Sequence, residues 1–535
     1  MIAPLYRSIR NIVLLIAVLL LCIWAFIGYR AWREAPLELW HTYVPHEMTV
    51  EEIDKTTWQS YLQHEQGLFE EVEQNITARL PVSAASSTNR FYKDSVVYPP
   101  SLPTNWNRSY EVPPVGALRG TAVLLHGLTD SPYSLRHIAS LYAQNGFHVF
   151  GVRLPGHGTA PSGLTAATWE DWVAGTRLAV RTANNLADAS DEPRLPLHIV
   201  GFSNGGALAV KYTLDALEND DLALPDRLVL VSPMIGITRF ARFAGIAAVP
   251  SVFPAFARAA WLDIVPEFNP FKYNSFPVNG ARQSHLLTAT VREQFTRMAK
   301  EGTLADMPPV LTFQSVLDYT VSAPAIFSGL YAFLPGNGSE LVLYDVNRAS
   351  KMAPLMSRAA LAAMSRIFPR LPQQYTISVY ANESRDSLRM IEKTVPAGSE
   401  QMVEHALEAE YHPGLFSLSH GAIPFPMDDP LYGMTPREES AEQYGLNLGA
   451  LFLRGERGAL AVRLEALHRT SSNPFFPLML EQIERYIHAD IASANTPEPP
   501  KEHATITAVK AETQEMEEAV RLFLEESEDE NIPYF

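Results

Sequence analysis

The sequence predicts an α/β fold in which helices cover both faces of a mostly parallel sheet. Two observations lead to this prediction: apolar segments of strand length alternate with amphipathic helical segments, and one passage from strand to helix is rich in glycine. The chain has 535 residues, 47% of them hydrophobic and 19% charged, which suffices for one large core with additions. We therefore expect a folded protein with one main domain.

The alternation of strands and helices begins near residue 117. The expected strands are apolar segments of the buried type: 120–127, 147–155, 195–203, 227–233, 309–318 and 340–346. The expected helices are amphipathic segments between these strands, at 134–146 and 204–217. This order predicts β-α-β units, since parallel neighbours need a crossover connection.

Charge and cysteine content exclude several classes of partner and site. The net charge of −17 argues against a nucleic-acid partner, whose phosphates would repel an acidic surface. The single cysteine, Cys22, excludes an intrachain disulfide and a thiolate metal cluster. No metal site is expected.

Residues 1–34 are predicted to anchor the protein in a membrane. From Asn11 to Tyr29 the chain is uncharged and apolar, and such a helix would reach about 28 Å, close to the roughly 30 Å of bilayer hydrocarbon. A cleaved signal peptide is the alternative, but the run ends in RAWREAP without an A-x-A site. The short amino-terminal side favours a cytoplasmic N-terminus and an extracytoplasmic body, periplasmic in a bacterium.

A candidate nucleophile lies in HIVGFSNGGALAV, residues 198–210. The pattern G-x-S-x-G is present as Gly201, Ser203 and Gly205, with a buried strand before it and a helix after it. Glycine on both sides permits the tight turn that a strained, exposed serine requires. The alternative is an ordinary glycine turn with an incidental serine.

A candidate oxyanion hole follows the strand GTAVLLH. The backbone N–H of Leu128 comes just after that strand, and the N–H of Asn204 begins the helix after Ser203. Two such donors would stabilise the negative charge of a tetrahedral intermediate. His126 is a possible base, but its place at a strand end favours a role in shaping the loop.

Four motifs in order, HGLTDSPYS, RLPGHGTAPSG, ATWEDW and GFSNGG, resemble the α/β-hydrolase fold, in particular its monoacylglycerol-lipase and carboxylesterase-like branch. The resemblance covers about residues 117–325 and resumes near His420. It implies a Ser-acid-His triad, ester hydrolysis through an acyl-enzyme, no cofactor, and a lid inserted after the strand that follows the nucleophile. The lid would occupy about residues 236–308, a segment rich in aromatic residues and proline.

The remaining triad members are expected after later strands. Asp318 follows the strand at 309–315 in the family's position for the acid, and Asp345 is its competitor. The family's usual position for the histidine, near 340–348, contains none, so an insertion delays the loop. His420, in SLSHG, is the favoured base and His412 the competitor.

Other segments of the chain complete the predicted organisation. They are a stalk or clasp at 35–116 with a helix near 50–76, the hydrolase domain at 117–490, a second insertion at about 349–413 with an acidic helix near 400–410, and an acidic tail at 491–535.

These observations predict a membrane-anchored serine hydrolase that cleaves carboxylic esters, with acylglycerol or related lipid esters as substrates. Thioesterase, acyltransferase or peptidase chemistry on the same triad is the first alternative. A membrane-tethered binding protein that has lost catalysis is the second. The expected partners are the ester substrate and the membrane, and the sequence leaves protein partners open.

Overall fold

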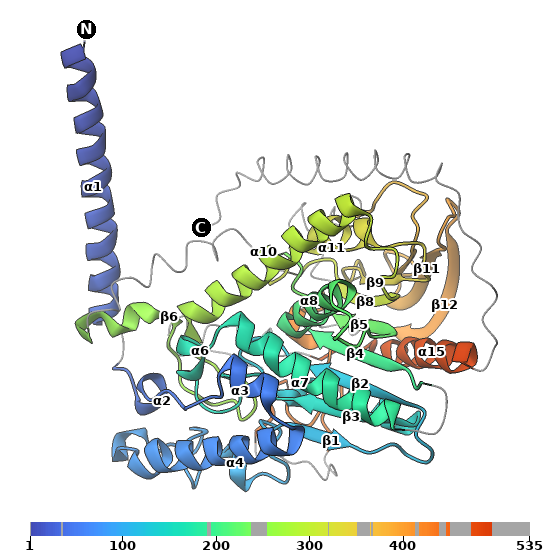
Figure 1. Cartoon of the computed structure of the whole chain (residues 1–535), viewed down its shortest axis with the longest axis horizontal. Coiled ribbons are helices and arrows are strands. Elements are labelled where there is room, and N and C mark those ends of the chain that lie inside the picture. The colour runs from blue at the N-terminus through green and yellow to red at the C-terminus, as the bar shows by residue number, and fades with distance from the viewer. Residues whose placement is uncertain are drawn as a thin grey trace.

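The computed structural model (Figure 1) describes a central sheet with helices around it. The described residues are 2–33, 36–189, 194–236, 254–318, 320–349, 364, 367–411, 417–437, 444, 446–449 and 472–494. Part of the predicted lid, His412 and most of the predicted acidic tail lie outside these ranges.

The central sheet has ten strands in the order β1-β3-β2-β4-β5-β8-β9-β10-β11-β12. Their bounds are β1 (Tyr110–Val112), β2 (Gly120–Leu125), β3 (Phe147–Val152), β4 (Leu197–Phe202), β5 (Arg227–Val231), β8 (Val310–Ser315), β9 (Glu340–Tyr344), β10 (Thr376–Asn382), β11 (Arg389–Val395) and β12 (Val403–Glu410). The strands from β3 to β10 are parallel, and β1, β11 and β12 pair antiparallel at the edges. A separate two-stranded sheet pairs β6 (Trp261–Asp263) with β7 (Phe276–Pro277).

Helices surround the sheet and connect its strands. The α-helices are α1 (Ile2–Arg33), α2 (Leu39–Thr42), α3 (Val50–Lys55), α4 (Trp58–Asn75), α5 (Arg136–Gln144), α6 (Gly163–Ala166), α7 (Trp169–Asp188), α8 (Asn204–Glu218), α10 (Val278–Glu301), α11 (Ala323–Gly329) and α15 (Phe476–Ala494). The 3-10 helices are η1 (Thr77–Arg79), η2 (Val82–Ala84), η3 (Pro99–Ser101), η4 (Pro132–Leu135), η6 (Pro254–Ala260), η7 (Tyr331–Phe333) and η9 (His420–Ala422). The helix expected near 50–76 is therefore two helices, because Thr57 caps the start of α4.

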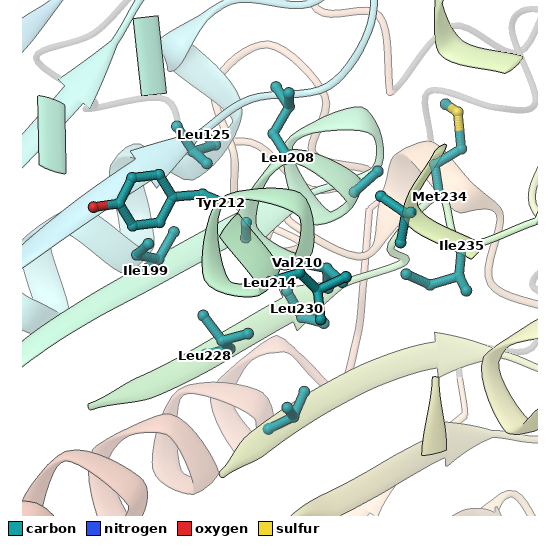
Figure 2. Close-up of a cluster of buried hydrophobic side chains, with 14 of the residues drawn as sticks. Leu125, Ile199, Leu208, Val210, Tyr212, Leu214, Leu228, Leu230, Met234 and Ile235 are labelled. Atoms are coloured by element: carbon teal, nitrogen blue, oxygen red, sulfur yellow. The ribbon is translucent and has the colours of Figure 1, made fainter. Parts of the chain in front are cut away.

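The core lies on both faces of the sheet, which explains the continuous apolar strands. On β2, Val123 and Leu125 join a cluster with α7, α8 and α10, whereas Ala122 and Leu124 join a cluster with α5 and α15. Figure 2 shows part of the first cluster, where side chains of β2, β4 and β5 meet α8. The sheet is thus covered on both sides, as predicted for parallel strands.

The first helix, α1, extends away from the body (Figure 1). Large apolar side chains along it are exposed, including Leu15 and Leu21, each at 71%. Taken over the described residues, no helix has both the length and the apolar character needed to cross a bilayer. The structure therefore does not support a membrane-spanning helix in residues 1–34.

The acidic helix predicted near 400–410 is wrong. These residues form β12, an edge strand that pairs antiparallel with β11. Alanine, leucine and glutamate favour helix intrinsically, but pairing with a neighbouring strand overrides that preference. An ion pair of 3.0 Å between Glu404 and the opposite residue Lys393 supports the strand.

Candidate active site

Ser203 occupies the turn between β4 and α8. Its backbone has φ 55° and ψ −116°, a conformation that residues with a side chain rarely adopt and that therefore stores strain. Hydrogen bonds tie the turn to β5 and the residues after it: the Ser203 N–H donates to the Val231 carbonyl at 3.0 Å, and the Ser203 carbonyl accepts from the Met234 N–H at 2.9 Å. Strain at a serine held this firmly between a strand and a helix is typical of a nucleophile, and Ser203 is 5% exposed.

The two glycines of the motif are required by close backbone approach. A Cβ at Gly201 would lie 2.4 Å from the Gly205 carbonyl oxygen, and one at Gly205 would lie 2.0 Å from the Leu125 carbonyl oxygen. Any side chain would push the strand and the helix apart. The pattern G-x-S-x-G therefore has a steric cause at both glycines.

The loop that carries Leu128 lies directly against the serine. A Cβ at Gly127 would be 3.2 Å from the Ser203 Cβ, so the loop passes next to the candidate nucleophile. Asn204 is the first residue of α8, and its N–H has no acceptor within the helix. The two predicted oxyanion donors thus belong to segments that border Ser203.

Asp318 and His420 meet, although 102 residues separate them in the chain. His420 Nδ1 and Asp318 Oδ2 are 2.7 Å apart, and the Asp318 side chain is fully buried. Because an ionised carboxylate only accepts hydrogen bonds, the proton is assigned to Nδ1, which leaves Nε2 as the basic nitrogen.

Backbone and side-chain donors hold Asp318 in its ionised form. Its Oδ1 accepts the N–H groups of Thr320 and Val321 at 2.8 and 3.0 Å, and its Oδ2 also accepts from Gln314 Nε2 at 3.0 Å. Burial would raise the pKa of Asp318, but the charge and hydrogen bond of His420 and these N–H groups bring the pKa below its usual value. The sequence analysis did not identify Gln314 as a partner of the acid, although a polar residue inside an apolar strand is a signal for such a role.

His420 also lies beside the serine turn. Its ring is stacked 5.4 Å from the ring of Phe202, the residue that precedes Ser203. The Ser315 hydroxyl donates to the Leu418 carbonyl at 2.8 Å and ties the histidine loop to the end of β8. The three predicted residues therefore belong to segments that converge at the carboxyl ends of β4 and β8.

The other candidates for the acid and the base of the triad lie elsewhere or make other contacts. Asp345 accepts from Arg348 Nε at 2.8 Å, and His405 is exposed on β12. His126 is buried, which lowers its pKa to about 3 and keeps the ring neutral. His412 lies outside the described residues.

Comparison with known proteins gives one family model and one curated relative. The model described as "Serine aminopeptidase, S33" matches residues 116–307. The relative is a thermostable monoacylglycerol lipase of Bacillus sp. (strain H-257), 33% identical over 97 residues. That alignment covers 18% of this chain and 34% of the lipase, so the chain matches about a third of the relative's length.

Two solved structures are also similar. One comes from a study of two metagenome-derived lipolytic enzymes, with 22% identity, a TM-score of 0.36, and coverage of 50% of this chain and 98% of that one. The other is a monoglyceride lipase of Saccharomyces cerevisiae, with 14% identity, a TM-score of 0.35, and coverage of 44% and 81%. The observed sheet order, the serine turn and the family match together show that the chain has the α/β-hydrolase fold and support a serine hydrolase.

Proposed function

We propose that this protein is a serine hydrolase that cleaves carboxylic esters through an acyl-enzyme. The observation that carries the proposal is the 2.7 Å hydrogen bond between His420 and the buried Asp318, next to the strained turn of Ser203. A nucleophile needs a base, and the base needs a group that fixes its tautomer. These three residues have the types that this division of roles requires, and they follow one another along the chain in the order typical of α/β-hydrolases.

In the proposed mechanism, the Ser203 hydroxyl attacks the ester carbonyl while His420 Nε2 takes its proton. Asp318 stabilises the imidazolium that forms, and the N–H groups of Leu128 and Asn204 bind the oxyanion. Collapse of the tetrahedral intermediate breaks the bond to the alcohol, which leaves with the proton from His420. Water then attacks the acyl-enzyme by the same route and releases the acid and Ser203.

Acylglycerols or related lipid esters are the proposed substrates. The similarity to a monoacylglycerol lipase supports this class. The aromatic lid, in contrast, gives less support than its composition suggests, because Trp261, Phe271 and Tyr273 are buried in packing contacts.

Peptidase chemistry is the second candidate, and the family description favours it specifically. A Ser-Asp-His site serves acyl transfer from esters, thioesters and amides alike. A panel of p-nitrophenyl esters of increasing chain length, monoacylglycerols and aminoacyl amides separates these activities. We expect ester turnover to exceed amide turnover. A preference for aminoacyl amides would favour the second candidate.

The basic test is Ser203→Ala, which deletes the nucleophile and little buried volume. We expect turnover of every ester to fall by about 10⁶-fold with circular dichroism unchanged. Turnover near that of the wild type would contradict the assignment. A wild-type protein that binds lipid but hydrolyses nothing would instead favour a membrane-tethered binding protein.

We also propose that α1 holds the protein at a membrane, with the catalytic body on the extracytoplasmic side. Exposed apolar side chains such as Leu15, Leu21 and Phe26 support attachment, because water-exposed apolar surface of this extent is costly. A chain that begins at residue 36 should leave the membrane fraction and keep its activity on soluble esters. Equal sedimentation of both forms with membranes would contradict this role for α1, and protease protection in sealed vesicles tests the orientation.

A further inference from the structure

A buried ionic cluster joins the segment before the main domain to the loop after β3. Arg153, the first residue after β3, is fully buried and contacts two carboxylates. Its Nη1 and Nη2 donate to Glu47 Oε1 and Oε2 at 2.7 and 2.9 Å, and its Nε donates to Glu65 Oε1 at 3.1 Å. Both glutamates precede residue 116, where the family match begins. The cluster is thus an addition to the family's own segment.

Glu47 holds more than the guanidinium. Its Oε1 also accepts the Gly156 N–H at 2.8 Å, and Arg153 Nη1 donates to the His157 carbonyl at 2.9 Å. The carboxylate and the arginine together therefore fix the backbone of the loop 153–158. A bidentate pair of this kind fixes geometry as well as charge.

The loop 153–158 is in turn connected to the candidate oxyanion loop through His126. The Leu154 N–H donates to His126 Nε2 at 3.1 Å, so this nitrogen is the acceptor of the neutral ring. His126 Nδ1 therefore carries the proton and donates to the Gly127 carbonyl at 2.8 Å. Gly127 immediately precedes Leu128, so this bond orients the peptide plane that carries the Leu128 N–H.

A second connection runs through Tyr273 of the lid segment. Its hydroxyl donates to the Gly156 carbonyl at 3.1 Å, and its backbone N–H donates to the Thr129 carbonyl at 2.7 Å. Thr129 has φ 62°, an unfavourable value for threonine that needs outside contacts to persist. The loop around Leu128 is therefore held from both sides by groups that contact the loop 153–158.

From these contacts we infer that Glu47 is a positioning residue for the hydrolysis: it clamps the loop 153–158 and thereby sets the position of the Leu128 N–H in the oxyanion hole. This inference rests on the proposed function. The segment 36–116 thereby contributes to the chemistry. The Glu47 carboxylate does not contact the reacting atoms, but it supports the loop whose Leu128 N–H binds the oxyanion.

The test compares Glu47→Gln with the wild type in the full chain, using a soluble short-chain ester. Displacement of an oxyanion donor weakens transition-state binding more than substrate binding. We expect kcat to fall about 10- to 100-fold while KM changes by less than about threefold. Inhibition by a trifluoromethyl ketone, whose adduct places an oxyanion in the hole, should weaken by a factor similar to the fall in kcat/KM.

Glu73→Gln is the matched control. Glu73 lies in the same segment and pairs with Lys93 at 2.6 Å, and it contacts neither Glu47 nor the loop 153–158. We expect its kcat and its inhibition to equal those of the wild type. Glu47→Asp, which keeps the charge, should recover part of the loss.

Two results would overturn the inference: folded Glu47→Gln with wild-type kcat and inhibition, or an equal loss in Glu73→Gln. If Glu47→Gln does not fold, Glu47→Asp decides the question, since wild-type values for this variant would overturn it too. A wild-type protein without ester turnover would overturn the proposed function itself, which is a different outcome from an active wild type that is insensitive at Glu47.

Discussion

The serine side and the histidine side of the candidate site are built in different ways. Ser203 and the loop of Leu128 follow neighbouring strands. Their positions are determined by close backbone approaches at Gly201 and Gly205 and by the side chains of Phe202 and Ser203 against Gly127. His420 reaches the site only after the antiparallel extension β10-β11-β12, and side-chain contacts hold its loop. The comparison shows that one half of the site follows from local sequence and the other from long-range packing.

Asp429 is the main side-chain link between the late loop and the early part of the domain. It is fully buried and accepts from Arg136 Nη2 at 2.8 Å, from His137 Nε2 at 3.0 Å and from the Tyr133 hydroxyl at 3.0 Å. These three donors follow the loop of Leu128 in the chain. The link therefore fixes the loop of His420 against the structure that supports the oxyanion hole.

The strongest loss of kcat is expected on the histidine side of the site. His420→Ala should lower kcat about 10⁴- to 10⁶-fold, because loss of the base disables the whole triad. His405→Ala is the control, because that side chain is exposed on β12 and should leave kcat unchanged. We also expect His412→Ala to have little effect. The measurement is kcat for each variant on one soluble ester, with folding checked by circular dichroism. An inactive His412→Ala and an active His420→Ala would show that His412 is the base.

The second prediction separates the two candidate acids. Asp318→Asn should lower kcat about 10³- to 10⁴-fold, because an amide no longer selects the tautomer of His420 or stabilises its cation. Asp345→Asn should change kcat by less than about threefold, since Asp345 contacts Arg348 and not the histidine. Reversal of the two results in the same assay would assign the acid to Asp345.

The sequence was sufficient for the serine side and only partly sufficient for the rest. The periodicity of apolar residues and the glycine pattern predicted the turn of Ser203 and the strands β2, β3, β4, β5, β8 and β9, because these depend on neighbours close in the chain. Residues 403–410 were misassigned because pairing with β11 outweighs their helix propensity. The role of Glu47 was not predicted because it depends on a contact with Gly156, 109 residues away, that no local pattern shows. Gln314 was missed although its polar side chain within an apolar strand was a local signal.

The third prediction concerns stability and its pH dependence. Burial alone would raise the pKa of Asp429, but Arg136 and His137 bring it below its usual range. A lowered folded-state pKa contributes stability above the unfolded value of about 3.9 and loses it as the pH falls further. Asp429→Asn should therefore lower the free energy of unfolding by about 3–5 kcal/mol at pH 7. The difference from the wild type should shrink at pH values below about 4.

The smallest effect is expected for an exposed ion pair in the segment before the domain. Asp54 accepts from Arg177 at 2.8 and 2.9 Å, but the two side chains are 38% and 25% exposed. Asp54→Asn should change the free energy of unfolding by less than about 1 kcal/mol. Urea unfolding of Asp429→Asn and Asp54→Asn at pH 7 and pH 3.5 gives the two changes in the free energy of unfolding. Equal losses at pH 7 would show that Asp429 stabilises the fold no more than an exposed ion pair does.

A fluorophosphonate label tests whether Ser203 is the nucleophile that the Asp318–His420 pair activates. The labelled residue is identified by peptide mass spectrometry in the wild type and in His420→Ala. We predict a label on Ser203 in the wild type and a labelling rate at least about 10³-fold lower in the variant. Ser232, which also has a positive φ of 45° and is fully buried, is the built-in comparison and should stay unlabelled. A label on Ser232 or another residue, or undiminished labelling of Ser203 in His420→Ala, would contradict this assignment.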